Sequence, residues 1–242
     1  MASAAADRVS GGVLNASETG AARRSPGYAL AIFDFDGTLA NSGDWFLSIV
    51  DDLARRFRFR AAGREDVEML RGLSTREVIR YLGIPRWKLP AIARHIHALL
   101  AEQIDQIAPF DGIDTLLETL QAGGMRLAIV TSNSEANVRT VLGPASIARI
   151  ERFECGASLF GKARLFRRVL RRSGLAPHQV IAIGDETRDI TAARKAGISA
   201  GAVLWGYANR AALSRLEPDV LFETPGDVVQ LLLGSPTDAR GS

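Results

Sequence analysis

The segment Phe33–Leu39 (FDFDGTL) constrains the fold of this 242-residue chain more than any other. It follows an apolar run from Tyr28 to Ile32, which is typical of a buried strand in a parallel sheet. Because side chains alternate along a strand, Asp34 and Asp36 are expected on the same side. Two neighbouring carboxylates repel each other unless a cation or a shared proton offsets the charge. The segment therefore predicts a charged site at the carboxyl end of a strand, where open α/β sheets bind ligands.

The rest of the chain alternates between apolar, strand-like runs and amphipathic, helix-like segments. This alternation predicts an α/β fold built on a doubly wound parallel sheet. The stretch around Cys155 carries neither pattern and is predicted to be irregular. Beyond the first strand, strands are predicted at residues 125–130, 180–183, 200–204 and 220–222.

A different pattern occupies residues 44–108, where apolar residues recur every three or four positions. This is helical spacing, and glycine and proline breaks divide it into separate helices. The region therefore predicts an all-α cap domain, inserted directly after the first strand. The core domain then comprises residues 28–43 and 109–233, while residues 1–27 and 234–242 are predicted to be a disordered leader and a disordered tail.

Composition limits the classes of partner and the compartment. The net charge is +3, but the basic residues form no stripe with interleaved aromatics, so nucleic acid binding is not expected. No apolar run approaches the roughly 20 residues of a membrane span, so no membrane association is expected. Cys155 is the only cysteine, which excludes an internal disulfide and fits a reducing compartment such as the cytoplasm. The oligomeric state is left open between monomer and homodimer.

Polar residues follow three of the predicted strands. Thr131 and Ser132 follow the second strand, and Asp185 follows the third, with Glu186 and Asp189 beside it. The carboxyl ends of parallel strands meet at one edge of a sheet, so these side chains are expected to converge with the first pair of aspartates. Carboxylates from two strand ends suit a hard cation, and Mg²⁺ prefers oxygen ligands. A magnesium site is therefore predicted at this edge.

The same residue types suit phosphoryl transfer. A carboxylate can attack phosphorus and form an aspartyl-phosphate, and a second carboxylate two residues on can exchange a proton with the leaving oxygen and then with water. A lysine can neutralise developing negative charge, and Lys162, at the predicted start of a helix, is the best placed. A helix starting near Asn133 can add backbone N–H groups that bind the phosphate.

With these motifs, residues 28–233 resemble the haloacid dehalogenase superfamily of hydrolases, close to the phosphoglycolate phosphatase-like branch with a helical cap. The resemblance of Asp34-Phe35-Asp36-Gly37-Thr38 to the first family motif implies that Asp34 is the nucleophile and Asp36 the acid/base. Thr131 matches the phosphate-binding hydroxyl of the second motif, with Ser132 and Asn133 beside it. Lys162 matches the lysine of the third.

The fourth motif is matched by Gly184–Asp189 and implies the metal ligands. In the family, the aspartate at the position of Asp185 binds magnesium together with the side chain of Asp34 and the backbone carbonyl of Asp36. The resemblance gives Asp189 a place in the metal shell or a role in orienting the lysine, with Glu186 beside it.

The chain departs from the family pattern in two places. Ala163 and Arg164 follow Lys162 where many relatives have a proline, which leaves open whether Arg164 shares the role of the lysine. Ala40-Asn41-Ser42 stands where many relatives show an acidic residue and a serine. Asn41 is a candidate for the mouth of the site or for the cap of the next helix.

Substrate choice in this family depends on the cap, and the loop Arg71–Arg76 is the cap segment expected to face the pocket. Arg71 and Arg76 suit a small phosphorylated acid, because arginine pairs bidentately with carboxylate. The equally weighted alternative to a substrate-binding loop is one that only connects two cap helices and exposes its arginines to solvent.

The favoured hypothesis is a Mg²⁺-dependent phosphomonoesterase that acts on a small phosphorylated metabolite, with phosphoglycolate as the first candidate. A sugar-phosphate mutase shares all four motifs and stays open. A haloacid dehalogenase would need neither the second aspartate nor magnesium. A phosphoryl-accepting signalling module would lack both the cap and the acid/base.

Overall fold

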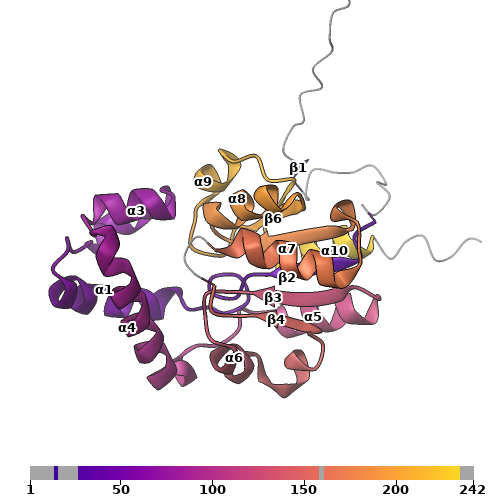
Figure 1. The fold of residues 1–242 in the computed structure, drawn as a ribbon, viewed down its shortest axis with the longest axis horizontal. Helices are drawn as coiled ribbons and strands as arrows, with labels where there is room; N and C mark the ends of the chain where they lie inside the picture. Colours follow the sequence, from indigo (N-terminus) through magenta and orange to yellow (C-terminus); the bar gives the residue numbers. More distant parts are fainter. Residues whose placement is uncertain (1–13, 16–26, 158–160, 235–242) are drawn as a thin grey trace, which may run out of the picture.

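The computed structural model describes residues 14–15, 27–157 and 161–234, and a parallel β-sheet lies at its centre (Figure 1). In this part of the chain the sheet has seven strands in the order β1-β7-β6-β5-β2-β3-β4, and every neighbouring pair is parallel. The strands are β1 (Leu14–Asn15), β2 (Leu30–Phe33), β3 (Arg126–Val130), β4 (Arg152–Glu154), β5 (Val180–Gly184), β6 (Ser199–Val203) and β7 (Val220–Phe222).

Helices cover both faces of the sheet, and the alternation of side chains along the strands supplies a separate core to each face. In β2, Ala31 and Phe33 belong to one buried cluster, whereas Leu30 and Ile32 belong to the other. The helices of the first face are α5 (Ile113–Ala122), α6 (Glu135–Ile147) and α10 (Pro225–Leu233). Those of the second face are α7 (Lys162–Ser173), α8 (Thr187–Ala196) and α9 (Arg210–Ser214).

The predicted doubly wound parallel sheet is confirmed, with two local corrections. The stretch around Cys155, predicted to be irregular, contains β4, which pairs with β3 from Ala128 to Val130. The sequence pattern missed this strand because it is only three residues long and includes two charged residues. Leu14–Asn15 pair with β7, so the predicted disordered leader is wrong for these two residues. Residues 1–13, 16–26 and 235–242 of the predicted leader and tail lie outside the described residues.

A helical segment is inserted between β2 and β3, and Figure 1 shows it to one side of the sheet. We call residues 43–106 the cap; the domain limits of 44–108 stay a prediction. Trp45 Nε1 donates to Gln103 Oε1 at 2.8 Å and so ties the two ends of this segment together. Its elements are α1 (Gly43–Phe57), η2 (Arg64–Asp66), α2 (Val67–Arg71), α3 (Thr75–Tyr81), η3 (Arg86–Lys88), α4 (Leu89–Glu102) and η4 (Ile104–Gln106).

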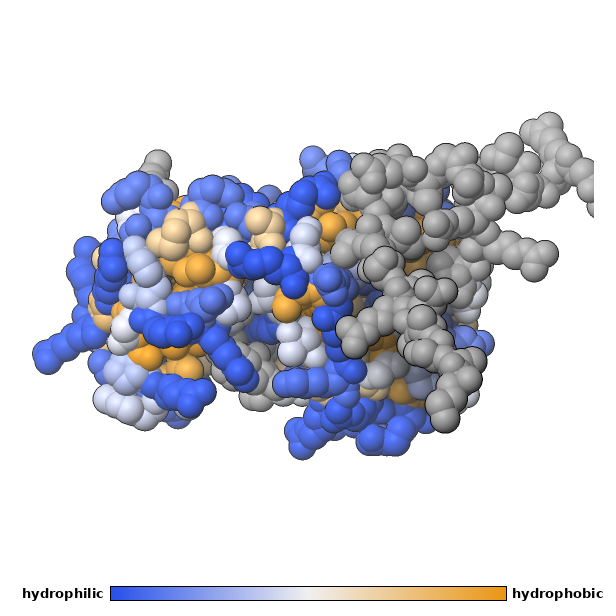
Figure 2. Space-filling view, turned by 90° about the horizontal axis from the view of Figure 1, so that it is seen from above, coloured by the Kyte–Doolittle hydropathy of each residue, from blue (hydrophilic) through white to orange (hydrophobic). Residues whose placement is uncertain are grey.

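The surface is mostly hydrophilic, with separate hydrophobic areas, in the face seen in Figure 2. Among the described residues, the large hydrophobic side chains that are exposed all belong to the cap: Phe46, Leu47, Met69 and Trp87. Within the same part of the chain, none of the helices combines the length and the apolar character needed to span a membrane.

The core packing of α5 yields a stability prediction. Leu117 is fully buried between this helix and the sheet, so Leu117→Ala removes packed volume and should lower the free energy of unfolding by about 2–5 kcal/mol. The matched control is Leu47→Ala, because Leu47 is 46% exposed; its effect should stay within about 0.5 kcal/mol. Urea unfolding followed by circular dichroism measures both. Equal losses in the two variants would contradict this account of the core.

Candidate active site

The order of the strands brings the predicted site residues together. β2 lies between β5 and β3, with Phe33 level with Ile183 on one side and with Ile129 on the other. Each of these strands is followed directly by a predicted site residue: β2 by Asp34, β5 by Asp185 and β3 by Thr131. The three residues therefore share one edge of the sheet.

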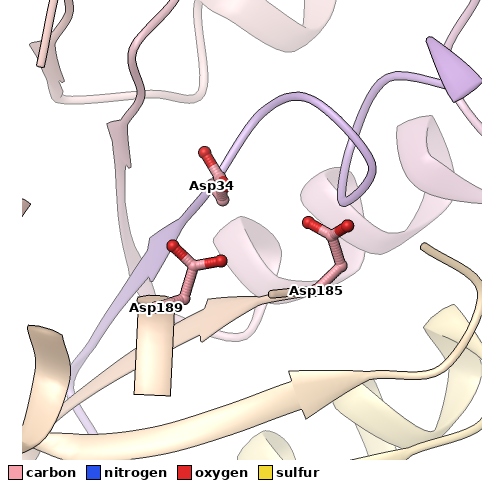
Figure 3. A group of neighbouring side chains, drawn as sticks. All are labelled: Asp34, Asp185 and Asp189. Carbon is pink, nitrogen blue, oxygen red and sulfur yellow. The ribbon is translucent and has the colours of Figure 1, made fainter. Parts of the chain in front are cut away.

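Three buried carboxylates gather at this edge. One oxygen each from Asp34, Asp185 and Asp189 can be chosen so that all three lie within 4.8 Å of one another. Figure 3 shows these carboxylates around a common space, with Asp34 after its strand and Asp189 on α8. Asp189 lies near the start of that helix, where its Oδ2 accepts a hydrogen bond from the Glu186 backbone N–H at 3.1 Å.

Beside Arg188, which is mostly buried and pairs with Glu186, Lys162 supplies a second positive charge in contact with this cluster. It is the first residue of α7, its side chain is 2% exposed, and its Nζ forms ion pairs with Asp34 Oδ2 and, at 2.5 Å, with Asp189 Oδ1. Burial lowers the pKa of Lys162, but the two carboxylates outweigh this effect and the pKa is raised, so the lysine stays protonated. Arg164, the alternative to this lysine, is exposed.

The carboxylates still carry more negative charge than Lys162 and Arg188 balance. Burial raises the pKa of Asp34 to about 7 in spite of Lys162, and burial together with Glu186 raises the pKa of Asp185 well above its usual range. A cluster of oxygen ligands in which ionisation is this unfavourable fits a bound divalent cation, which would stabilise the ionised carboxylates.

Two hydrogen bonds and two closely packed glycines fix the Asp185 carboxylate. Thr38 Oγ1 donates to Asp185 Oδ1 at 2.9 Å, and the Tyr207 backbone N–H donates to Oδ2 at 2.8 Å. Gly37, which has a φ of +74°, and Gly206 pack so closely against this side chain that a Cβ at either position would overlap it. The backbone of two loops thus fixes the orientation of Asp185.

Asp36 lies beside the cluster, and polar side chains hold its carboxylate. Asn133 Nδ2 lies 3.2 Å from both Asp36 oxygens, and Ser42 Oγ donates to Oδ1 at 3.2 Å. The pKa of Asp36 is raised overall, because the effect of burial exceeds that of the hydrogen bonds from Asn133 and Ser42, which lower it. These contacts fix the orientation of the Asp36 carboxylate, and its acid/base role stays a prediction.

The segment after β3 provides hydroxyl and amide groups. Thr131 is buried, and its Oγ1 accepts a hydrogen bond from the Asn133 backbone N–H at 3.0 Å. Asn133 Oδ1 in turn accepts from Asn137 Nδ2 at 2.9 Å, which fixes the amide that binds Asp36. Ser132, between these residues, is partly buried, and Ser134 is the N-cap of α6.

The cap loop predicted to face the pocket is bonded to the core. Arg71 Nε donates to the Tyr207 carbonyl oxygen at 3.1 Å, and Arg71 Nη2 donates to the Gly206 carbonyl oxygen at 3.3 Å. Thr75 Oγ1 donates to Glu186 Oε2 at 2.8 Å, next to Asp185 in the chain. Arg76 is exposed at the start of α3. The contacts of Arg71 therefore join the cap to the core; a substrate-binding role for Arg71 or Arg76 stays a prediction.

Two residues at the site were not selected from the sequence. Ser42, rather than the neighbouring Asn41, contacts Asp36; Asn41 is exposed and Ser42 is buried. Ser42 also takes the N-cap position of α1, the role considered for Asn41. Tyr207 lies far along the chain, in the loop after β6, and the only sequence signal for it is the aromatic and glycine run Trp205-Gly206-Tyr207 after a predicted strand.

Comparisons with known proteins agree with this geometry. A family model described as haloacid dehalogenase-like hydrolase matches residues 31–203. The chain is 33% identical over 202 residues to a phosphoglycolate phosphatase from Synechococcus elongatus, covering 82% of this chain and 94% of that protein. It is 29% identical over 189 residues to the tyrosine-protein kinase PtkA of Mycobacterium tuberculosis, covering 76% of this chain and 65% of that protein.

Solved structures show the same fold. A haloacid dehalogenase-like family hydrolase from Streptococcus pneumoniae superposes with a TM-score of 0.69 at 22% identity, covering 84% of this chain and 97% of that one. The family match spans most of the chain and contains Asp34, Asp36, Thr131, Lys162 and Asp185, the residues that meet at the sheet edge. The chain belongs to the haloacid dehalogenase-like hydrolase family.

Proposed function

We propose that this protein is a Mg²⁺-dependent phosphomonoester hydrolase that works through an aspartyl-phosphate and acts on a small phosphorylated metabolite, with phosphoglycolate as the leading candidate. The observation that carries the proposal is the buried meeting of Asp34, Asp185 and Lys162 at one sheet edge, with Asp36 beside them. The name of the relative from Synechococcus elongatus supports the choice of phosphoglycolate.

The reaction divides between two carboxylates. An oxygen of Asp34 attacks phosphorus, the bond from phosphorus to the leaving oxygen breaks, and Asp36 gives its proton to that oxygen. Water then attacks the phosphorus of the aspartyl-phosphate, and Asp36 takes a proton from it. Inorganic phosphate leaves and Asp34 is restored as a free carboxylate.

Groups around the two aspartates are suited to binding the phosphoryl oxygens. Thr131 Oγ1 accepts from the Asn133 N–H, so its own hydrogen is available to a phosphoryl oxygen. Ser132 and Asn133 lie in the same turn before α6. Lys162 orients Asp34 through their ion pair and offsets negative charge as the phosphoryl group is transferred.

We assign the magnesium ligands as the side chains of Asp34 and Asp185 and the backbone carbonyl of Asp36. When bound, Mg²⁺ supplies positive charge that neutralises the phosphoryl oxygens and the carboxylates. Asp189 is assigned to orienting the lysine, because its two oxygens already bind Lys162 Nζ and the Glu186 N–H. Glu186 itself accepts from the cap through Thr75.

The cap arginines are the proposed recognition groups for the acid part of the substrate. Arg71 and Arg76 flank a loop that is bonded to the core beside Glu186. A guanidinium group pairs bidentately with a carboxylate, such as that of phosphoglycolate. Arg76 is exposed, whereas Arg71 would first have to release the Gly206 and Tyr207 carbonyl oxygens.

The first test is phosphate release from phosphoglycolate in the presence of Mg²⁺. Asp34→Asn removes the nucleophile and should lower kcat by about a thousandfold or more, with the circular dichroism spectrum unchanged. Asp52→Asn is the matched control and should keep full activity, because the Asp52 side chain is 70% exposed on the cap. Substantial turnover by Asp34→Asn would reject the assigned nucleophile.

The second test concerns the metal. Binding of Mg²⁺ to the folded state should raise the free energy of unfolding, by about 2.7 kcal/mol at one hundred times the dissociation constant. Asp185→Asn should abolish most of this gain, because it removes a charged ligand. Thermal unfolding with Mg²⁺ and with EDTA measures the effect in both proteins. A gain of the same size in the variant would remove Asp185 from the metal site.

A second candidate is phosphoryl transfer to an acceptor hydroxyl, which the similarity to a protein named as a kinase brings into consideration. We expect water to be the acceptor, so ³²P from a labelled phosphomonoester should appear as inorganic phosphate. The assay is repeated with glycerol and with tyrosine-containing peptides added. Transfer of most of the label to these acceptors would favour the transferase.

A further inference from the structure

A chain of hydrogen bonds leads away from Asp36 to the loop after β6. Ser42 Oγ donates to Asp36 Oδ1 at 3.2 Å and lies 2.6 Å from Tyr207 Oη. Ser42 is 2% exposed, so its hydroxyl group contacts Asp36 and Tyr207 rather than bulk solvent. Tyr207 thus reaches the proposed acid/base through one intervening hydroxyl.

The direction of this chain follows from the number of hydrogens. A serine hydroxyl carries one hydrogen, and Ser42 gives it to Asp36. While Asp36 is ionised, the short contact between Ser42 and Tyr207 is then made by the tyrosine hydrogen, with Tyr207 as the donor. Removing the tyrosine hydroxyl leaves Ser42 free to rotate away from Asp36.

The backbone of the same loop is joined to the cap and to the carboxylate cluster. The carbonyl oxygens of Gly206 and Tyr207 accept from the Arg71 guanidinium, and the Tyr207 N–H donates to Asp185. Trp205 Nε1 donates to the Thr38 carbonyl oxygen at 2.9 Å, which holds the loop against the segment that carries Asp36. Displacing the Arg71 guanidinium would free these two carbonyl oxygens from the cap, while Asn209, two residues on, keeps its bonds to the Arg71 carbonyl oxygen and to Glu68.

We propose that Tyr207 is a positioning residue that orients Asp36 through Ser42, and that docking of Arg71 on the Gly206 and Tyr207 carbonyls links the position of the cap to this orientation. The inference rests on the proposed function, because Asp36 needs its orientation to protonate a leaving oxygen. Tyr207 and Ser42 keep their hydrogens throughout and transfer none.

The test uses two esters that differ in their need for an acid. Phosphoglycolate releases an alkoxide, which requires protonation, whereas p-nitrophenyl phosphate releases a stable phenolate, which does not. Tyr207→Phe should lower kcat/KM for phosphoglycolate by about three- to tenfold, the worth of one hydrogen bond, and leave the value for p-nitrophenyl phosphate nearly unchanged. A purely structural tyrosine would lower both values equally.

Variants at Ser42 test the connecting step. Ser42→Ala should reproduce the selective loss, and adding Tyr207→Phe to it should cost nothing more, because both changes break one chain. Ser42→Thr keeps the hydroxyl and should retain most of the activity. Tyr81→Phe is the matched control, since Tyr81 Oη donates to Asp66 within the cap; it should leave both esters unaffected.

The link to the cap is tested with Arg71→Met. Arg71→Met should lower kcat/KM for phosphoglycolate less in a protein that already carries Tyr207→Phe than in the native protein. The reason is that part of the effect of Arg71 acts through Tyr207. Full additivity would overturn the link.

Equal losses on both esters, or none, in Tyr207→Phe would overturn the positioning role. Failure of the native protein to hydrolyse either ester with Mg²⁺ would instead reject the proposed function.

Discussion

The buried ion pairs of Lys162 with Asp34 and Asp189 are the interaction on which the rest of the site depends. A charge removed from water is stable only beside an opposite charge with good geometry. Here one ammonium group joins the end of β2, the start of α7 and the first turn of α8. The ion pairs therefore link the balance of charge at the site to the way these three elements meet.

Much of this arrangement follows from local sequence. Apolar runs ending in acidic or hydroxyl residues identified β2, β3 and β5 and the residues that follow them, because strand burial and strand-end chemistry both leave local patterns. β4 left no such pattern, since three residues with two charges carry no periodicity. Tyr207 escaped prediction because its contact with Ser42 joins segments far apart in the chain, which no spacing rule encodes. Ser42 lies only six residues from Asp36, but the sequence does not show whether Asn41 or Ser42 turns toward that carboxylate.

Arg71 illustrates a different limit. Its residue type suggested an anionic ligand, but in the fold its guanidinium donates to backbone carbonyl oxygens of the core. Carbonyl acceptors are present at every residue, so the sequence cannot indicate which of them an arginine will bind. The cap is thus joined to the core by main-chain acceptors, together with the Thr75–Glu186 and Asn209–Glu68 side-chain hydrogen bonds.

The glycines around Asp185 have a consequence for how such a protein can change its specificity. Neither Gly37 nor Gly206 can accept even a methyl group without displacing the carboxylate. These two positions therefore cannot gain a side chain that reaches a bound molecule. A change of specificity has to come from other positions, among which the cap loop Arg71–Arg76 is joined to the same Gly206–Tyr207 backbone.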